Sequence, residues 1–251
     1  MNDSHIAALL KAYAHDIKGS LGANAAFARL ILEEYGSKLD EKGAKWLSLM
    51  ANEYALTDIK LSRLSHYSQL YKYQVRTEDC HLGTIIGTVI GSIIGNNPSD
   101  KMQVQANNVA INYPRKPIIK SDSNLLHMYF SELIANTQQH AAHQSKHNSE
   151  TKVHIRYNNA DKVHQLVYIE HDTMLSDDEI AYIQLPLKTL DTAHSKLNNA
   201  GMGFTILQRI AELLSGNLKV ELINNGDDNL QAHSQGHSDS SLVVTLEFPQ
   251  E

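Results

Sequence analysis

The residues of this chain best suited to covalent chemistry are His15 and Asp16, near its beginning. They lie in an amphipathic run from about Ser4 to Tyr35, whose apolar residues fit the a and d positions of a heptad. In that frame His15 takes position f, furthest from the seam, so we expect its imidazole to face water. An exposed imidazole can act as a nucleophile when an adjacent carboxylate holds its tautomer and takes its proton. The same pattern also fits an ordinary solvated histidine.

Two long helices are expected to position this pair. The a and d residues of the first are Ile6, Leu10, Tyr13, Ile17, Phe27 and Ile31, and Tyr13 and Ile17 should face a partner helix. The second begins after Asp40, a good N-cap, and runs to about Tyr73. Its seam is Leu47, Met50, Tyr54, Thr57, Leu61, Leu64, Ser68 and Tyr71. A short linker makes the two an antiparallel hairpin. One hairpin cannot cover both seams, so we expect two copies to form a dimeric four-helix bundle.

Composition narrows the class of protein. The 251 residues, 42% of them hydrophobic, suit one large domain or two small ones. The net charge of −6 provides no basic face for nucleic acid or acidic lipid. No apolar run is long enough to cross a bilayer, and the N-terminus lacks a secretion signal. The single cysteine, Cys80, excludes an internal disulfide, so we expect a cytoplasmic protein.

A second domain is expected after the helical hairpin. The periodicity breaks near residue 76, which places a boundary between a helical domain, residues 1–75, and a second domain, residues 76–251. Helices are expected over about 82–94, 123–146 and 201–214. Strands are expected over 102–106, 110–113, 153–157, 163–169, 218–223 and 242–248. This order predicts helices on one face of a mostly antiparallel sheet, and the class α + α/β for the whole chain.

Three segments, in order, resemble the motifs of the histidine-kinase family of two-component signalling. The segment from His15 to Leu21 resembles the phosphoacceptor box, H-D/E-L/I-K/R-x-P-L. Glu132 to Asn136 resembles the Asn box, E-L-I/L-x-N-A-x-K, and Ala200 to Ile206 resembles the glycine box, T-G-L-G-L-x-I. The resemblance covers nearly the whole chain. It implies a dimerisation and histidine-phosphotransfer hairpin followed by a GHKL, or Bergerat-like, α/β sandwich.

The resemblance assigns roles to individual residues. His15 would accept a phosphoryl group, with Asp16 as the base and Lys18 as a further member of the catalytic box. The nucleotide-binding residues that it implies are Glu132, Asn136, Glu170, Gly201 and Gly203. The Asn would reach a Mg²⁺ ion held by the nucleotide phosphates, and Glu132 would lie near the γ-phosphate. The two glycines precede a helix N-terminus, whose backbone N–H groups can take phosphate oxygens.

The nucleotide motifs also depart from the family pattern. The family's adenine box, D-x-G-x-G-I/L, is replaced by a segment in which Glu170 stands for the Asp, and Asp172 and Met174 stand for the glycines. Glu170 is one methylene longer than the Asp that accepts the adenine amino group. Gln139 replaces the lysine of the Asn box, and Leu185 to Leu187 replace the aromatic segment of the lid. These changes indicate a degenerate nucleotide pocket.

The phosphoacceptor motif is retained, whereas the nucleotide-binding motifs are degenerate. This combination predicts a histidine phosphotransferase of a phosphorelay. Such a protein would carry a phosphoryl group on His15 between receiver-domain aspartates and would need no cofactor of its own. Its partners would be a second copy of itself, response-regulator receiver domains and a hybrid histidine kinase. Two alternatives stay open: a soluble sensor histidine kinase that uses ATP and Mg²⁺, and a non-catalytic dimeric scaffold or inhibitor.

Partner contact is expected on the hairpin around His15, at Ala14, Lys18, Gly19, Leu21 and Gly22. Ser20 replaces the proline of the family box, and Gly19 stands where family phosphatases carry Thr or Asn, so that phosphatase route is not expected.

His140, His143 and His147 share one predicted helical face, at a spacing that could hold Zn²⁺. No carboxylate or cysteine joins them, so solvated histidines are expected there, and no metal site is predicted.

Overall fold

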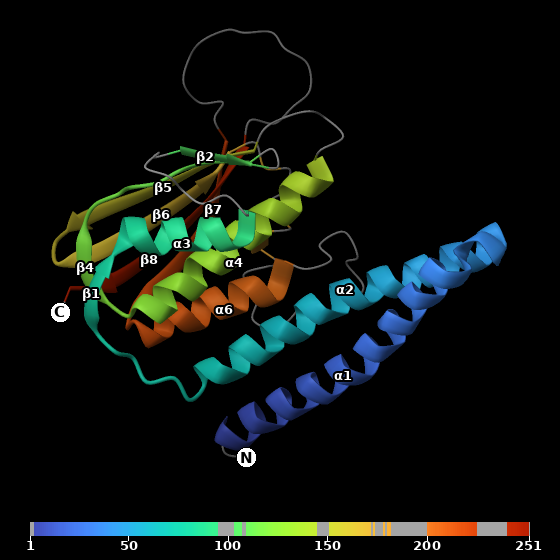
Figure 1. Cartoon of the computed structure of the whole chain (residues 1–251). Helices are drawn as coiled ribbons and strands as arrows, with labels where there is room; N and C mark the ends of the chain where they lie inside the picture. The colour runs from blue at the N-terminus through green and yellow to red at the C-terminus, as the bar shows by residue number, and fades with distance from the viewer. Residues whose placement is uncertain are drawn as a thin grey trace, which may run out of the picture. The chain divides into compact units, whose positions relative to one another are not determined.

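The computed structural model of the chain comprises two compact units, residues 1–73 and 74–251 (Figure 1). It describes residues 3–94, 103–106, 109–144, 151–171, 173, 178, 180–181, 200–224 and 240–250. No helix in these stretches is both long enough and apolar enough to cross a bilayer.

The first unit is a hairpin of two long helices, as predicted. Helix α1 spans Asp3–Tyr35, a short 3-10 turn spans Gly36–Lys38, and α2 spans Glu41–Leu70. Asp40 is the N-cap of α2, and its carboxylate accepts a hydrogen bond from the Gly43 backbone N–H at 2.8 Å. The linker is too short for any arrangement but an antiparallel one, which Figure 1 shows.

Small residues form the contact between the two helices. Ala14 is only 3% exposed, and Ala25, Ala28 and Ala51 are also buried. Gly22 lies beneath the Tyr54 ring: a Cβ atom at Gly22 would come within 2.9 Å of its hydroxyl oxygen. The seam inside the hairpin is therefore rotated by about one residue, roughly 100°, from the predicted heptad seam.

The larger apolar residues of α1 lie outside this seam. Tyr13 is 63% exposed, and Ile17, Phe27 and Ile31 are exposed as well. α2 leaves much of each of these side chains uncovered within one chain, so the expectation that they face a partner helix concerns a second copy. Together with exposed residues of both helices they form what we call the apolar face: Leu9, Tyr13, Ile17, Phe27, Leu30, Ile31, Trp46, Leu49 and Met50.

The second unit is built on a six-stranded sheet in the order β2-β3-β5-β6-β8-β7. Its strands are β2 (Gln103–Ala106), β3 (Val109–Asn112), β5 (Thr151–Ala160), β6 (Val163–Glu170), β7 (Asn217–Asn224) and β8 (Ser240–Pro249). Only β3 and β5 pair in parallel, and every other pair is antiparallel, as predicted. Because side chains alternate along each strand, one face of this sheet is available for a core.

Three helices cover that face: α3 (Leu82–Ile94), α4 (Ser123–Gln144) and α6 (Ala200–Leu213) (Figure 1). The core between helices and sheet is made of fully buried side chains from both layers, including Ile86, Ile90, Leu125, Leu126, Phe130, Ile206, Leu207, Leu166 and Val244. The glycine- and isoleucine-rich helix α3 contributes Ile86 and Ile90 to this core. This packing fixes α4 and α6 against the sheet.

One feature of this unit is missing from the prediction. Strands β1 (Glu78–His81) and β4 (Ile118–Ser121) pair as a separate two-stranded antiparallel sheet. Each is four residues long and carries polar side chains, so its sequence has little apolar alternation. The buried Cys80 thiol donates a hydrogen bond to the Ser121 carbonyl oxygen at 3.3 Å, and burial raises its pKa to about 11. The lone cysteine is thus structural.

Candidate functional site

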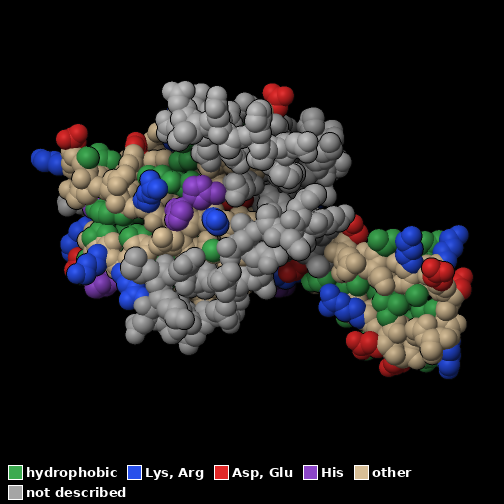
Figure 2. Space-filling view, turned by 90° about the horizontal axis from the view of Figure 1, so that it is seen from above, with side chains coloured by type: hydrophobic (Ala, Val, Ile, Leu, Met, Phe, Trp, Pro, Cys, Tyr) green, Lys and Arg blue, Asp and Glu red, His purple; other side chains and the backbone are tan. Residues whose placement is uncertain are grey.

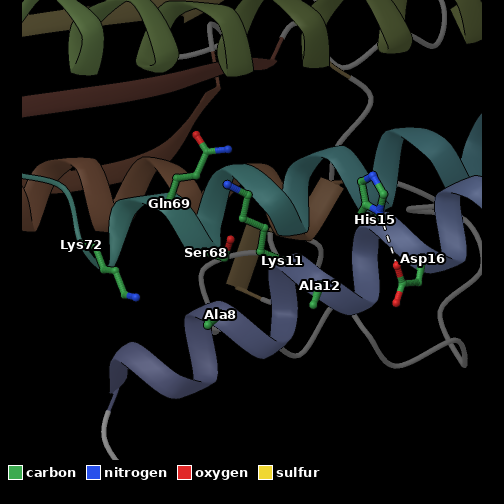
Figure 3. A pocket seen from close by; sticks show the side chains of 8 residues that line it. All are labelled: Ala8, Lys11, Ala12, His15, Asp16, Ser68, Gln69 and Lys72. Carbon is green, nitrogen blue, oxygen red and sulfur yellow. Dashed lines mark hydrogen bonds and ion pairs between the residues drawn. The ribbon is translucent and has the colours of Figure 1, made fainter.

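His15 and Asp16 form an exposed pair on α1. The side chain of His15 is 88% exposed and that of Asp16 is 81% exposed. The His15 Nδ1 and Asp16 Oδ1 atoms lie 3.3 Å apart (Figure 3). Because a carboxylate oxygen can only accept, Nδ1 carries a proton in this arrangement, and in the neutral imidazole the lone pair is then on Nε2. The ring faces solvent, as predicted.

A groove of about 630 Å³ adjoins the imidazole. It lies between α1 and the C-terminal end of α2 (Figure 3). Its lining combines small, cationic and amide side chains: Ala8, Lys11, Ala12, His15, Asp16, Ser68, Gln69 and Lys72. A partner surface could therefore reach His15 over two alanines, with a lysine from each side of the groove.

Lys18 lies one turn after His15, but its ammonium group is engaged with α2. The Nζ atom lies 2.8 Å from Asp58 Oδ1 and 3.3 Å from Ser62 Oγ. The hydrogen bond to Asp58 raises the pKa of Lys18 above its usual value. The structure therefore ties this predicted catalytic residue to the opposite helix and does not bring it to the groove.

The partner surface predicted around His15 needs a correction. Ala14 is buried in the hairpin seam, and Leu21 and Gly22 are half-buried there. Lys18 and Gly19 are exposed, and a Cβ atom at Gly19 would meet nothing within 4 Å. The groove adds a further surface beside the imidazole, on its N-terminal side. The prediction is wrong for Ala14, because the heptad frame placed the seam one residue away from its observed position.

The second unit brings three of the predicted nucleotide residues together. Glu132 and Asn136 lie one turn apart on α4, and both side chains are buried. A Cβ atom on Gly203 of α6 would come 2.9 Å from Asn136 Nδ2 and 3.4 Å from Glu132 Oε2. The side-chain ends of Asn136 and Glu132 therefore lie directly against the backbone of α6 at Gly203. Gly201 lies in the first turn of the same helix.

The chemistry of this cluster suits a phosphate–magnesium group in part. The side-chain oxygens of Glu132 and Asn136 are hard ligands of the kind that Mg²⁺ prefers. The N-terminus of α6, with Gly201 and Gly203, offers backbone N–H groups to an anion. Within the described residues, however, no group of three or more His, Cys, Asp or Glu side chains could hold a metal ion.

Glu170 has a different environment. It is 2% exposed, at the end of β6, and its Oε2 atom accepts a hydrogen bond from the Thr137 hydroxyl. Thr137 Oγ1 also lies 2.6 Å from the Tyr168 hydroxyl. Since Thr137 has one proton and gives it to Glu170, Tyr168 must donate to Thr137. Burial, and then the nearby Glu170 charge, raises the pKa of Tyr168 well above its usual value, which keeps this donor protonated.

We call this chain of hydrogen bonds, Tyr168 to Thr137 to Glu170, the carboxylate relay. The sequence analysis missed both hydroxyl residues. One signal was present: Thr137 stands where the Asn-box pattern has a small alanine. The other, Tyr168, could be expected to face the core from the alternation along its strand.

A second polar cluster was also missed. His154 Nδ1 lies 2.8 Å from His171 Nε2, and His171 Nδ1 lies 3.2 Å from Ser241 Oγ. Figure 2 shows histidine side chains grouped near Lys or Arg on one face of the second unit. This cluster is a hydrogen-bonded pair of imidazoles rather than a three-ligand site.

Several predicted positions lie outside the described residues. These are Asp172, Met174, the lid segment 185–187 and His147. Gln139, His140 and His143 belong to α4, but the placement of their side chains is not described.

Comparison with known proteins shows which solved structures this fold resembles. No protein-family model matches the sequence, and no curated protein matches it. Among solved structures, full-length ShkA in complex with AMPPNP is 13% identical, with a TM-score of 0.56 over 96% of this chain and 45% of that one. The histidine kinase ThkA, in complex with the response regulator TrrA, is 12% identical, with a TM-score of 0.56 over 100% of this chain and 64% of that one. The Acinetobacter baumannii histidine kinase AdeS is 11% identical, with a TM-score of 0.53 over 94% and 98%.

These matches establish the class of fold. At such low identity the likeness is one of architecture, and the architecture is that of histidine kinases. The chain spans less than half of the ShkA chain and about two thirds of the ThkA chain.

The carboxylate relay predicts a measurable effect on stability. Thr137→Val keeps the shape of the side chain but removes the donor to a buried carboxylate, so it should lower the free energy of unfolding by about 1–3 kcal/mol. Thr151→Val is the matched control, because the buried Thr151 hydroxyl has no hydrogen-bond partner among the described residues. Urea unfolding of both variants measures the difference. Equal stability of the two would show that the relay contributes nothing to folding.

Proposed function

We propose that this protein is a cytoplasmic histidine phosphotransferase of a two-component phosphorelay. The observation that carries the proposal is the exposed His15–Asp16 pair beside a groove, on the helical hairpin of a histidine-kinase fold. A solvent-facing imidazole with an unprotonated Nε2 is the group that phosphoryl transfer from an acyl phosphate requires. The adjoining groove supplies the room for a donor protein.

The proposed phosphoryl transfer to His15 needs no cofactor from this chain. The lone pair of His15 Nε2 attacks the phosphorus of a receiver's aspartyl phosphate, and a nitrogen–phosphorus bond forms. The bond between phosphorus and the aspartyl oxygen breaks, and the carboxylate leaves with the electron pair. The imidazole becomes a phospho-imidazolium, whose Nδ1 proton stays hydrogen-bonded to Asp16. The reverse reaction delivers the phosphoryl group to a second receiver.

One observation favours a second candidate, a kinase that phosphorylates His15 with ATP. Glu132, Asn136 and Gly203 converge as a nucleotide–magnesium site would require. ShkA was solved with AMPPNP, which shows the ligand that such a fold can take. Against this candidate stand the departures from the family's adenine box, in which Glu170 replaces the Asp and Asp172 and Met174 replace the two glycines. The phosphotransferase remains the better supported of the two.

The working unit is proposed to be a homodimer. The apolar face of the hairpin is exposed in one chain and lies on a different side of α1 from His15. A second hairpin that covers this face completes a four-helix bundle and leaves both imidazoles accessible. Burial of such large side chains stabilises the assembly by about 1.5–3 kcal/mol for each fully covered residue.

The partner of the groove is proposed to be a receiver domain, which a hybrid histidine kinase would phosphorylate. ThkA was solved with a response regulator, so this fold can bind one. The groove's own chemistry supports an acidic partner surface, because Lys11 and Lys72 both line it.

Phosphorylation is expected to occur on His15 and to come from a receiver. Incubation with radiolabelled phospho-receivers, prepared with acetyl phosphate, should label the wild-type chain with acid-labile, base-stable phosphate. His15→Gln should take no label, whereas His66→Gln, at another exposed histidine of the hairpin, should take as much as wild type. Asp16→Asn should slow transfer by about fivefold or less, because an exposed ion pair is worth only about 0–1 kcal/mol.

The same assay separates the alternatives. Label from Mg-ATP alone, on His15, would replace the phosphotransferase with a kinase. If a His15→Gln chain still regulates its two-component system in cells, the protein acts as a non-catalytic scaffold or inhibitor, and both catalytic proposals are wrong.

The dimer is expected to depend on the apolar face. Phe27→Glu together with Ile31→Glu places charge where apolar surface is buried, so the chain should shift from dimer to monomer. Ala26→Glu is the control, since this exposed neighbour lies on the polar side of α1. Sedimentation analysis at micromolar concentration measures the change. A wild-type chain that sediments as a monomer would overturn the bundle.

The groove lysines are expected to govern docking. Lys11→Glu and Lys72→Glu should each slow transfer from phospho-receivers, by about tenfold together, because like charges then face an acidic partner. The slowing should shrink as salt rises. Lys45→Glu, near the start of α2, is the charge-matched control and should leave the rate unchanged. Equal rates for all variants would move the docking surface away from the groove.

A further inference from the structure

We propose that Asp58 of α2 holds Lys18 in the unphosphorylated chain and releases it to the phosphoryl group once His15 is phosphorylated. Asp58 is then a positioning residue, which acts on His15 through the lysine. This inference deepens the proposed function, because it concerns the phosphorylated state of the same histidine. It adds a carboxylate on the second helix that competes with the phosphoryl group for one cation, and so weakens the hold of His15 on that group.

The ammonium group of Lys18 crosses from α1 to α2 in the unphosphorylated chain. Its Nζ atom lies 2.8 Å from Asp58 Oδ1 and donates to Ser62 Oγ at 3.3 Å. The Tyr54 hydroxyl donates to the same Asp58 oxygen, also at 3.3 Å. Departure of the lysine therefore leaves Asp58 with a hydrogen-bond donor, which lowers the cost of releasing it.

The ion pair is open enough to exchange partners. The side chain of Lys18 is 47% exposed and that of Asp58 is 32% exposed. Water and salt screen such a pair, so it holds the lysine only weakly. A phosphoryl group on a side chain carries about −1.5 to −2 charges at pH 7, which is more than a carboxylate carries. Phosphorylated His15 is therefore the stronger competitor for the ammonium group.

The position of Lys18 on α1 places it within reach of that group. Residues three apart on a helix are neighbours on its surface, as His15 and Lys18 are. Helical side chains lean toward the N-terminus, so the Lys18 side chain extends over the turn that carries His15. By the same rule Lys11, four residues before His15, leans away from the imidazole. Rotation of the Lys18 side chain then suffices to move its ammonium group from Asp58 to a phosphoryl group on Nε2.

The test uses the full-length chain phosphorylated by phosphoramidate, a small-molecule donor. The His15 Nε2 lone pair attacks its phosphorus, the bond from phosphorus to the donor nitrogen breaks, and ammonia leaves. The ³¹P signal of phospho-His15 is the one that a His15→Gln chain lacks after the same treatment. Its shift, followed against pH, gives the pKa of the phosphoryl group, which a paired ammonium group lowers.

We expect Lys18→Met to raise this phosphoryl pKa by about 0.2–0.7, the size expected of an exposed ion pair. Asp58→Asn frees the lysine and should lower the pKa by a similar amount. In the Lys18→Met background, Asp58→Asn should change nothing, because its effect passes through the lysine. Glu53→Gln and Lys60→Met, at exposed positions of the same helix, are the charge controls and should leave the pKa unchanged.

Two outcomes overturn the inference. One is a phosphoryl pKa that Lys18→Met does not raise, and the other is an Asp58→Asn shift of equal size with and without Lys18. Both side chains are partly exposed, so neither substitution is expected to unfold the hairpin. Phosphoramidate acts without a protein donor, so the result does not depend on receivers. Receivers that fail to label His15 would remove the proposed function alone, and an unchanged pKa would remove the role of Asp58 alone.

Discussion

The close approach of α1 and α2 is the constraint on which the hairpin depends. Ala14, Ala25 and Ala28 bring only single methyl groups from α1 into the contact, and Gly22 leaves room there for the Tyr54 ring of α2. Helices that meet through small residues lie near the lower end of the usual interaxial distance of about 8–10 Å. Every bulky residue of α1 must then point to another side. This exclusion divides the helix into a seam, an apolar face and a polar face that carries His15.

A second constraint governs the second unit, where polar groups are buried and must be satisfied. Glu132 and Glu170 are both buried carboxylates, yet their surroundings differ. The first lies against Gly203, whose missing side chain leaves space beside it. The second accepts a hydrogen bond from Thr137, to which Tyr168 in turn donates. The two buried carboxylates therefore differ in the groups that the chain places around them.

The sequence predicted the helices and strands better than it predicted the contacts between them. Helix periodicity, the Asp40 cap and strand alternation located the long elements, because each of these signals is local. The exposure of His15 followed from the same periodicity. The seam was displaced by one residue because alanines carry little weight in an apolar pattern, although they permit the closest packing. The Thr137–Glu170 bond joins residues 33 positions apart, and no local signal predicts such a pair.

The exposure of His15 has a consequence for specificity. It is one of 14 histidines in the chain, and its ion pair with Asp16 is open to water on both sides. Such a pair is worth about 0–1 kcal/mol, which is far less than the lowering of a barrier that phosphoryl transfer needs. If His15 transfers phosphoryl groups as proposed, most of the rate must come from groups that a docked partner arranges in a site closed to water. Under that proposal the fit of the partner to the groove beside His15 decides the reactivity of this imidazole.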